Sequence, residues 1–165
     1  MKLMKALTVW QPWASFIAIE AKPYEFRGWR PPASIIGERI AIHAGARPMK
    51  LLELRNLLNA LCDPNTDIPT PCLHRDKALP LLQRILDEHS RAIPRFLPLS
   101  HVLCTAVVGE PKPGNACARE FGETAGNDSD REGTFNWGWP MLDVQPLTPP
   151  APATGLQGLW NWSQP

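Results

Sequence analysis

The sequence contains no hydrophobic run long enough to cross a membrane, and it carries almost no net charge. Its 165 residues have a net charge of +1 and 44% hydrophobic residues, which excludes a disordered, highly charged chain. The chain also shows no internal repeats, and its length suits one domain that buries its own core. We therefore expect a single domain over residues 1–165, with no membrane partner.

Cysteine is sparse, and no two cysteines have Cys-x-x-Cys spacing. Cys62, Cys72 and His74 could share a metal in principle, but their spacing matches no usual zinc pattern. We therefore expect no metal and no cofactor, and free thiols of the kind found in reducing compartments. Gln11 and Pro12 interrupt the first apolar run, which is unlike a secretory signal peptide, so the expected location is the cytoplasm.

Proline, tryptophan and N-terminal basic residues are abundant. Nineteen prolines indicate short elements joined by ordered loops, and each of the seven tryptophans brings a large apolar face. Residues 1–50 have a net charge of +5, whereas residues 51–90 and 91–165 each have −2. The basic first third favours an anionic partner such as a phosphate backbone, although scattered solvated charge would give the same count.

Hydrophobic patterning predicts an α+β fold. Ile40, Ile42 and Ala44 face one side of their segment and His43 faces the other, which is the alternation of a half-buried strand. Five to seven short strands with flanking helices predict a curled sheet or small β-barrel. The expected strands cover residues 3–9, 24–27, 39–44, 101–110, 139–144 and 158–162, and a long loop is expected over residues 111–134.

Three helices are expected beside these strands. Residues 12–20 carry apolar side chains at helical spacing. Residues 48–61 form a strongly amphipathic pattern, and residues 76–93 predict a further helix with Pro80 in its first turn. No side chain in these last two helices indicates a reactive group, so we interpret residues 48–93 as a helical insertion.

Two groups of motifs give the most specific signal. The first comprises Gln11-Pro12-Trp13-Ala14-Ser15, Lys22, Glu25-x-Arg27-x-Trp29 and Ile42-His43-Ala44-Gly45. The second comprises Trp137-Gly138-Trp139, Leu142 and Gly155-Leu156-Gln157-Gly158-Leu159-Trp160. In this order, over about 75 residues, they resemble the ASCH domain family of the wider PUA-like β-barrel group. The chain departs from the family pattern at Ala21 and Thr154, where glycine and lysine are usual.

The resemblance implies a small PUA-like barrel with a cleft near the first helix and the strand after it, and RNA or a nucleotide as partner. Some members of the family are hydrolases, namely a ribonuclease and an amidohydrolase that acts on N4-acetylcytidine. The amidohydrolase branch uses a lysine, a threonine three residues later and a distant glutamate. Lys22 matches the lysine, but Glu25 stands at the threonine position. A carboxylate cannot replace a hydroxyl nucleophile without a change of mechanism.

Lys22, Glu25 and Arg27 are the central candidates for a site. Glu25 and Arg27 are two residues apart in an extended segment, so their side chains share a face. Arg27 can grip a phosphate while Glu25 orients it. Alternatively, Glu25 can act as general base while Lys22 stabilises negative charge, which makes both residues candidate catalytic groups. The alternative is a purely structural role, in which an ion-pair cluster holds the strand against the helix.

Four further residues are candidate nucleic-acid contacts. Trp29 and Arg30 follow the charged strand, where an exposed ring beside a cation can stack on a base. His43 can contact a ligand, or it can form a hydrogen bond at its strand end. Ser15 can reach a phosphate, or its hydroxyl can bond to a helix carbonyl. Trp13 lies on the apolar helix face and is expected to form the wall of the cleft.

Three functions remain open from the sequence. The first is an RNA- or nucleotide-binding ASCH-type domain with a cleft lined by lysine, glutamate and arginine. The second is a hydrolase that acts on RNA or a modified nucleoside. The third is a protein-interaction domain that docks a partner through the helical insertion, which requires that the apolar face of residues 48–61 is exposed.

Overall fold

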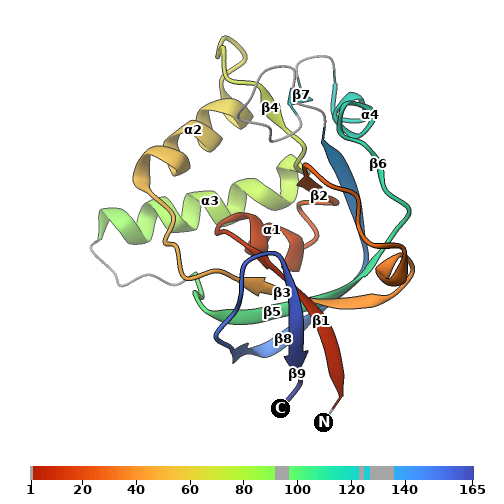
Figure 1. Cartoon of the computed structure of the whole chain (residues 1–165). Helices are drawn as coiled ribbons and strands as arrows, with labels where there is room; N and C mark the ends of the chain where they lie inside the picture. The colour runs from red at the N-terminus through yellow and green to blue at the C-terminus, as the bar shows by residue number, and fades with distance from the viewer. Residues whose placement is uncertain (1, 92–96, 123–124, 127–135) are drawn as a thin grey trace.

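The computed structural model describes residues 2–91, 97–122, 125–126 and 136–165 (Figure 1). In these ranges a seven-stranded sheet has the order β2-β8-β5-β3-β1-β9, with β6 also paired to β8, and β4 and β7 form a separate small sheet. The strands are β1 (Leu3–Val9), β2 (Tyr24–Arg27), β3 (Arg39–Ala44), β4 (Thr70–Pro71), β5 (His101–Val108), β6 (Lys112–Pro113), β7 (Ala125–Gly126), β8 (Trp137–Pro152) and β9 (Leu159–Ser163). The helices are α1 (Trp13–Ala18), η1 (Ala33–Ile35), α2 (Leu51–Cys62), α3 (Arg75–Ser90) and α4 (Gly114–Arg119).

The mixed α+β class is confirmed, but the predicted closed barrel is wrong, because the sheet is open with β2 and β9 at its edges. β2 has four residues and pairs with β8 alone. A side chain, and not a strand ladder, connects β2 to the end of β1. Arg27 Nη2 donates a 2.7 Å hydrogen bond to the carbonyl oxygen of Thr8. An opening therefore lies between the two strands.

β8 bends the sheet because it is long and its register is interrupted. Its residues 137–140 pair with β2, and its residues 141–152 pair with β5. Register shifts occur between Val102 and Cys104 and between Thr105 and Val107, and such irregularities increase local twist. The expected strand over 139–144 therefore continues through the proline-rich segment as far as Pro152.

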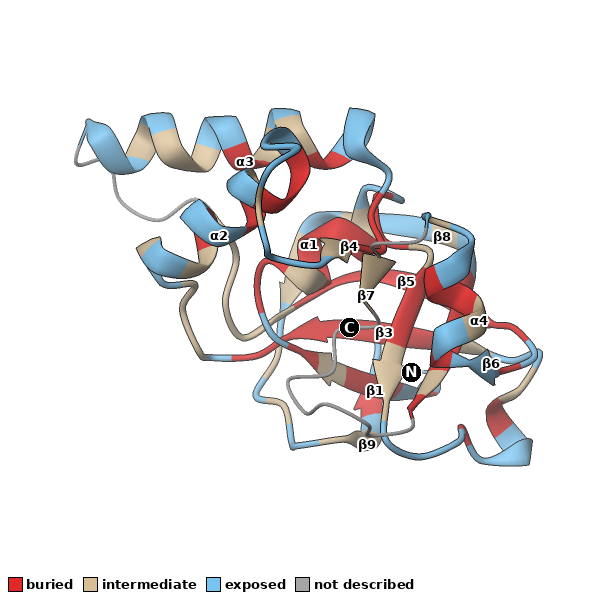
Figure 2. Ribbon diagram, turned by 90° about the horizontal axis from the view of Figure 1, so that it is seen from above, coloured by how far each residue is buried: buried red, intermediate tan, exposed pale blue. Residues whose placement is uncertain are grey.

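α1 packs on one face of the sheet against β3, β5 and β8, and it presents buried side chains to that face (Figure 2). Gln11 supports the start of the helix, because its side-chain oxygen accepts a 3.0 Å hydrogen bond from the Ser15 N–H. The amide nitrogen of Gln11 donates to the carbonyl oxygen of Pro98 at 2.9 Å. Gln11 is 1% exposed, so this buried amide is satisfied at both ends.

α2 and α3 lie together on one side of the molecule, and α1 lies between them and the sheet (Figure 1). The apolar face of α2 is buried, because Leu54, Leu57 and Leu61 pack in one cluster with Phe16 of α1 and Leu82 of α3. Docking of a protein partner through residues 48–61 required an exposed apolar face. In the structure these leucines are covered by α1 and α3. The interpretation of residues 48–93 as an insertion in one domain stays a prediction.

Three local expectations differ from the structure. The strand over 39–44 is buried on both faces instead of one, because Ala41 packs with Trp162 of β9 in a second core cluster. Pro80 lies in the second turn of α3, not the first. The expected loop over 111–134 contains the short helix α4, and its residues 123–124 and 127–134 lie outside the described ranges.

No helix in the described ranges is both long enough and apolar enough to span a membrane.

Candidate functional site

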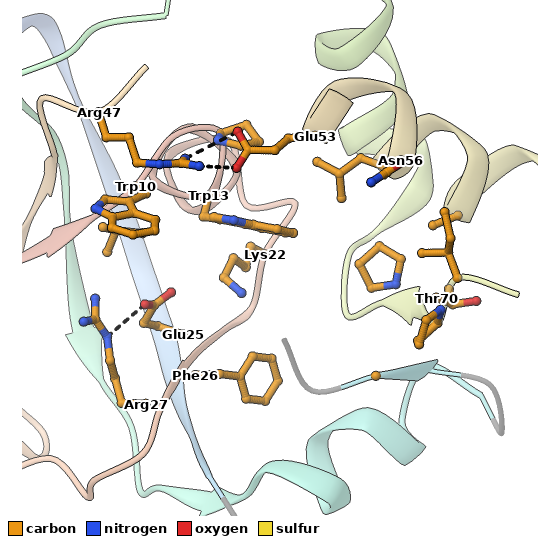
Figure 3. A pocket seen from close by; sticks show the side chains of 18 of the residues that line it. Trp10, Trp13, Lys22, Glu25, Phe26, Arg27, Arg47, Glu53, Asn56 and Thr70 are labelled. Carbon is orange, nitrogen blue, oxygen red and sulfur yellow. Dashed lines mark hydrogen bonds and ion pairs between the residues drawn. The ribbon is translucent and has the colours of Figure 1, made fainter. Parts of the chain in front are cut away.

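A pocket of about 730 Å³ opens between β1 and β2 (Figure 3). We call it the Lys22 pocket. It is bounded by residues 8–10 and Trp13 on one side, by residues 22–27 at its floor, and by Arg47, α2 and residues 68–71 on the other side. Its volume lies within the range of pockets that hold small-molecule ligands. The pocket therefore lies where the end of β1, the edge strand β2 and α2 come together.

Lys22 forms the floor of the pocket. The residue is 2% exposed, and its Nζ atom lies 5.0 Å from the ring centroids of both Trp13 and Phe26 (Figure 3). Its backbone N–H donates to the carbonyl oxygen of Phe16 at 3.1 Å, which ties it to the end of α1. Two aromatic faces that flank an ammonium stabilise it by cation–π attraction. A buried cation therefore borders a hollow large enough for a ligand.

Glu25 and Arg27 lie beside Lys22 on the same face of β2, as their spacing predicted. Arg27 Nε is 3.0 Å from Glu25 Oε1, although its N–H does not point at that oxygen, so the contact is an ion pair without an aligned hydrogen bond. Glu25 is 6% exposed, and the Arg27 side chain is about one-fifth exposed. The pair can orient a ligand, but it also spans the gap between β2 and Thr8.

The sequence did not indicate that Trp10, Arg47 and Glu53 would meet at the rim of the pocket. The Arg47 guanidinium carbon lies 4.5 Å from the centroid of the Trp10 ring. Arg47 donates to both carboxylate oxygens of Glu53, at 2.5 and 3.4 Å, and Glu53 also accepts a 2.7 Å bond from the Lys50 N–H. Burial raises the pKa of Glu53, but the bonds from Arg47 and Lys50 outweigh it, so the pKa is lowered overall.

The sequence did contain a signal for the position of Glu53 at the start of a helix. Glu53 stands three residues after Lys50 at the start of an amphipathic run, which is where a glutamate bonds back to the first N–H of a helix. Its pairing with Arg47, however, depends on where α2 packs.

Three predicted contact residues lie outside the Lys22 pocket. Ser15 is buried in α1. The Trp29 ring packs edge-on against Trp139 at 4.8 Å. Arg30 lies 4.8 Å above the Trp137 ring and pairs with the exposed Glu110 at 3.3 Å. Their side chains are used for packing and surface pairing, so the structure does not bring them together with Lys22.

His43 is also outside the pocket, and it is buried where an exposed polar face was expected. Its Nε2–H donates to the carbonyl oxygen of Ala153 at 2.9 Å, and its Nδ1 lies 3.2 Å from Thr8 Oγ1. The Thr8 hydroxyl donates to the carbonyl oxygen of Leu156 at 2.5 Å. His43 therefore fastens the segment between β8 and β9, whose Gln157 lines the pocket.

The stability of the protein should fall as the pH drops below the ordinary pKa of histidine, with His43 responsible for part of the loss. Burial lowers the pKa of His43, although its bond to Ala153 opposes this. Between the lowered pKa and about 6.5 the unfolded chain binds more protons, so stability rises with pH and is lost on acidification.

Urea unfolding at about pH 7.5 and about pH 5.5 measures this loss. It should shrink in His43→Gln and persist in His89→Gln, which changes an exposed histidine in the last turn of α3. An unchanged loss in His43→Gln would show that His43 is not the group responsible.

The described residues offer no group of three His, Cys, Asp or Glu side chains that could hold a metal ion. Cys62 is exposed and Cys72 is buried, and neither forms a disulfide. Burial raises the pKa of Cys104 to about 12, so its thiol is protonated at neutral pH.

The structural comparison shows that this chain has the fold of an ASCH domain. The chain is similar to the crystal structure of ASCH from Zymomonas mobilis, with a TM-score of 0.51 and 16% identity over 97% of this chain and 87% of that one. A structure of a point mutant of the same Zymomonas protein matches with a TM-score of 0.50 and 16% identity, over 97% and 89% of the two chains. No protein-family model and no curated protein gives a significant match. At this identity the likeness establishes the fold.

Proposed function

We propose that this protein binds single-stranded RNA, or a nucleotide from it, in the Lys22 pocket. The observation that carries the proposal is the buried ammonium of Lys22, held between the Trp13 and Phe26 rings at the floor of an open hollow. A cation at the base of an aromatic-lined pocket is complementary to a ligand that combines flat rings with negative charge. Nucleotides have both properties, and the ASCH fold supports the same class of ligand.

The polar groups of the pocket suit a nucleotide better than a simple anion. The pocket is lined by three cations, Lys22, Arg27 and Arg47, and by two carboxylates, Glu25 and Glu53. A site built only for phosphate would have little use for carboxylates in its lining, whereas a base edge offers both donors and acceptors. Glu25 can accept a hydrogen bond from an exocyclic amino group while a cation meets a phosphate or a base carbonyl.

Binding to RNA should weaken as salt is added. A fluorescently labelled single-stranded hexaribonucleotide can be titrated with the protein by fluorescence anisotropy at several salt concentrations. If one to three phosphates are contacted, the plot of log affinity against log salt should have a slope between about −0.7 and −2. RNA binding that does not respond to salt would contradict phosphate contact in the pocket.

A second candidate function is hydrolysis of RNA or of a modified nucleoside. Glu25 favours it, because a 6% exposed carboxylate lies beside a 2% exposed ammonium in the same pocket. Glu25 would remove a proton from water or from a 2′-hydroxyl, and Lys22 would stabilise the developing negative charge. Glu25→Gln should then abolish product formation, followed by chromatography, and retain most of the binding. Full turnover in that variant would exclude Glu25 as the base.

A further inference from the structure

We propose that the Lys22 pocket receives one nucleotide of a longer strand and that the neighbouring base stacks on Trp10. This inference rests on the proposed function, and it narrows the ligand from a free nucleotide to an oligonucleotide. The side chain that carries it is Trp10, which borders the pocket although 58% of its surface is exposed. Exposure of so large an apolar ring is unusual in a chain whose other tryptophans, except Trp29, are mostly covered.

The Trp10 ring is held in place on one side. The Arg47 guanidinium lies 4.5 Å from the ring centroid, and both carboxylate oxygens of Glu53 accept hydrogen bonds from Arg47 (Figure 3). The ring also lies close to Gly45, where an added Cβ atom would come 3.3 Å from Trp10 Cδ1. A ring that is already ordered loses little conformational entropy when a flat ligand stacks on it. Trp10 is therefore a preformed stacking surface.

The place of Trp10 determines which base it can meet. It directly follows β1, and Thr8, Val9 and Trp10 all line the pocket that has Lys22 at its floor. A strand whose nucleotide occupies that floor leaves the pocket across its rim, where Trp10 and Arg47 lie. Stacking on an aromatic side chain is tolerant of base identity, since every base has a π face. Arg47, whose guanidinium lies over the Trp10 ring, adds positive charge near the linking phosphate.

The test compares ligands that differ by one stacking base. Each of the four nucleoside monophosphates is titrated by calorimetry. The same measurement is then made with the dinucleotide that adds an adenosine, and with a matching dinucleotide in which the added unit is an abasic ribose phosphate. The dinucleotide should bind roughly ten-fold more tightly than the monophosphate, and the abasic extension should recover only a small part of that gain. This difference isolates the base from the added phosphate.

Trp10→Ala should remove most of the gain that the adenine base provides, and Trp10→Phe should retain part of it. Trp29→Ala is the matched control, because Trp29 is an exposed tryptophan whose ring packs on Trp139 outside the pocket. It should keep the ten-fold gain.

Monophosphate binding with no gain from the added base would overturn the inference and leave the proposed function intact. A gain that survives in Trp10→Ala, or that the abasic extension reproduces, would also overturn it. Failure of every monophosphate and dinucleotide to bind would overturn the proposed function and this inference together.

Discussion

Lys22→Met is expected to lower RNA or nucleotide affinity by roughly 100-fold while the fold persists. The substitution removes the ammonium that borders the pocket floor but keeps a flexible chain of similar length. A methionine sulfur packs well against aromatic rings, so the space between Trp13 and Phe26 stays filled. The far-UV circular dichroism spectrum should therefore stay that of the wild type.

The control is Lys77→Met, which removes an exposed lysine from the first turn of α3 and should leave affinity unchanged. Circular dichroism and thermal unfolding of both variants separate lost binding from lost structure. If the Lys22→Met protein folds and binds with wild-type affinity, Lys22 is not part of the binding site. A folded protein that has lost binding would support the pocket over a cluster that merely pins β2 to α1.

Gly155→Ala is expected to destabilise the protein by about 2 kcal/mol, which corresponds to a fall of about 5 °C in thermal midpoint. A Cβ atom at residue 155 would lie 2.3 Å from His43 Cε1 and 2.5 Å from His43 Nδ1. The ring cannot yield easily, because its two nitrogens contact Ala153 and Thr8 and its face meets Trp160 edge-on. The segment between β8 and β9 would therefore have to move away.

A double-mutant cycle identifies the cause. In a His43→Ala background, Gly155→Ala should cost less than about 0.5 kcal/mol, because the clashing ring is gone. Gly28→Ala is the matched control, since a Cβ atom there meets nothing within 4 Å, and it should be nearly neutral. An equal cost of Gly155→Ala in both backgrounds would show that the ring of His43 is not the obstacle.

Local periodicity predicted the elements that shape the pocket. The strand over residues 3–9 was found with the expected bounds, and the period of two in a strand placed Glu25 and Arg27 on one face. The motif pattern also predicted the ASCH fold, which the structural comparison confirms. The strand bounds and the shared face depend on neighbours in the sequence, and the fold was predicted from the order of motifs along the chain.

The features that were missed depend on long-range packing. Alternation in β3 assigned His43 to one face but could not show that β9 and the end of β8 cover that face. Likewise, amphipathicity predicted that α2 buries one side, but it could not show that Glu53 would pair with Arg47 at the rim of the pocket. Barrel closure depends on whether two edge strands meet, and no property of β2 taken alone decides that.

The proline content of β8 has a consequence for the behaviour of the protein at high concentration. Five of the sixteen residues of this strand are prolines, and each lacks the N–H group that a neighbouring strand would need. Among the described residues, only the first part of β8 has a pairing partner on the side away from β5, so its second half forms an edge. Missing donors along such an edge hinder the addition of a strand from another molecule. We therefore expect the prolines of β8 to protect the protein against edge-to-edge aggregation.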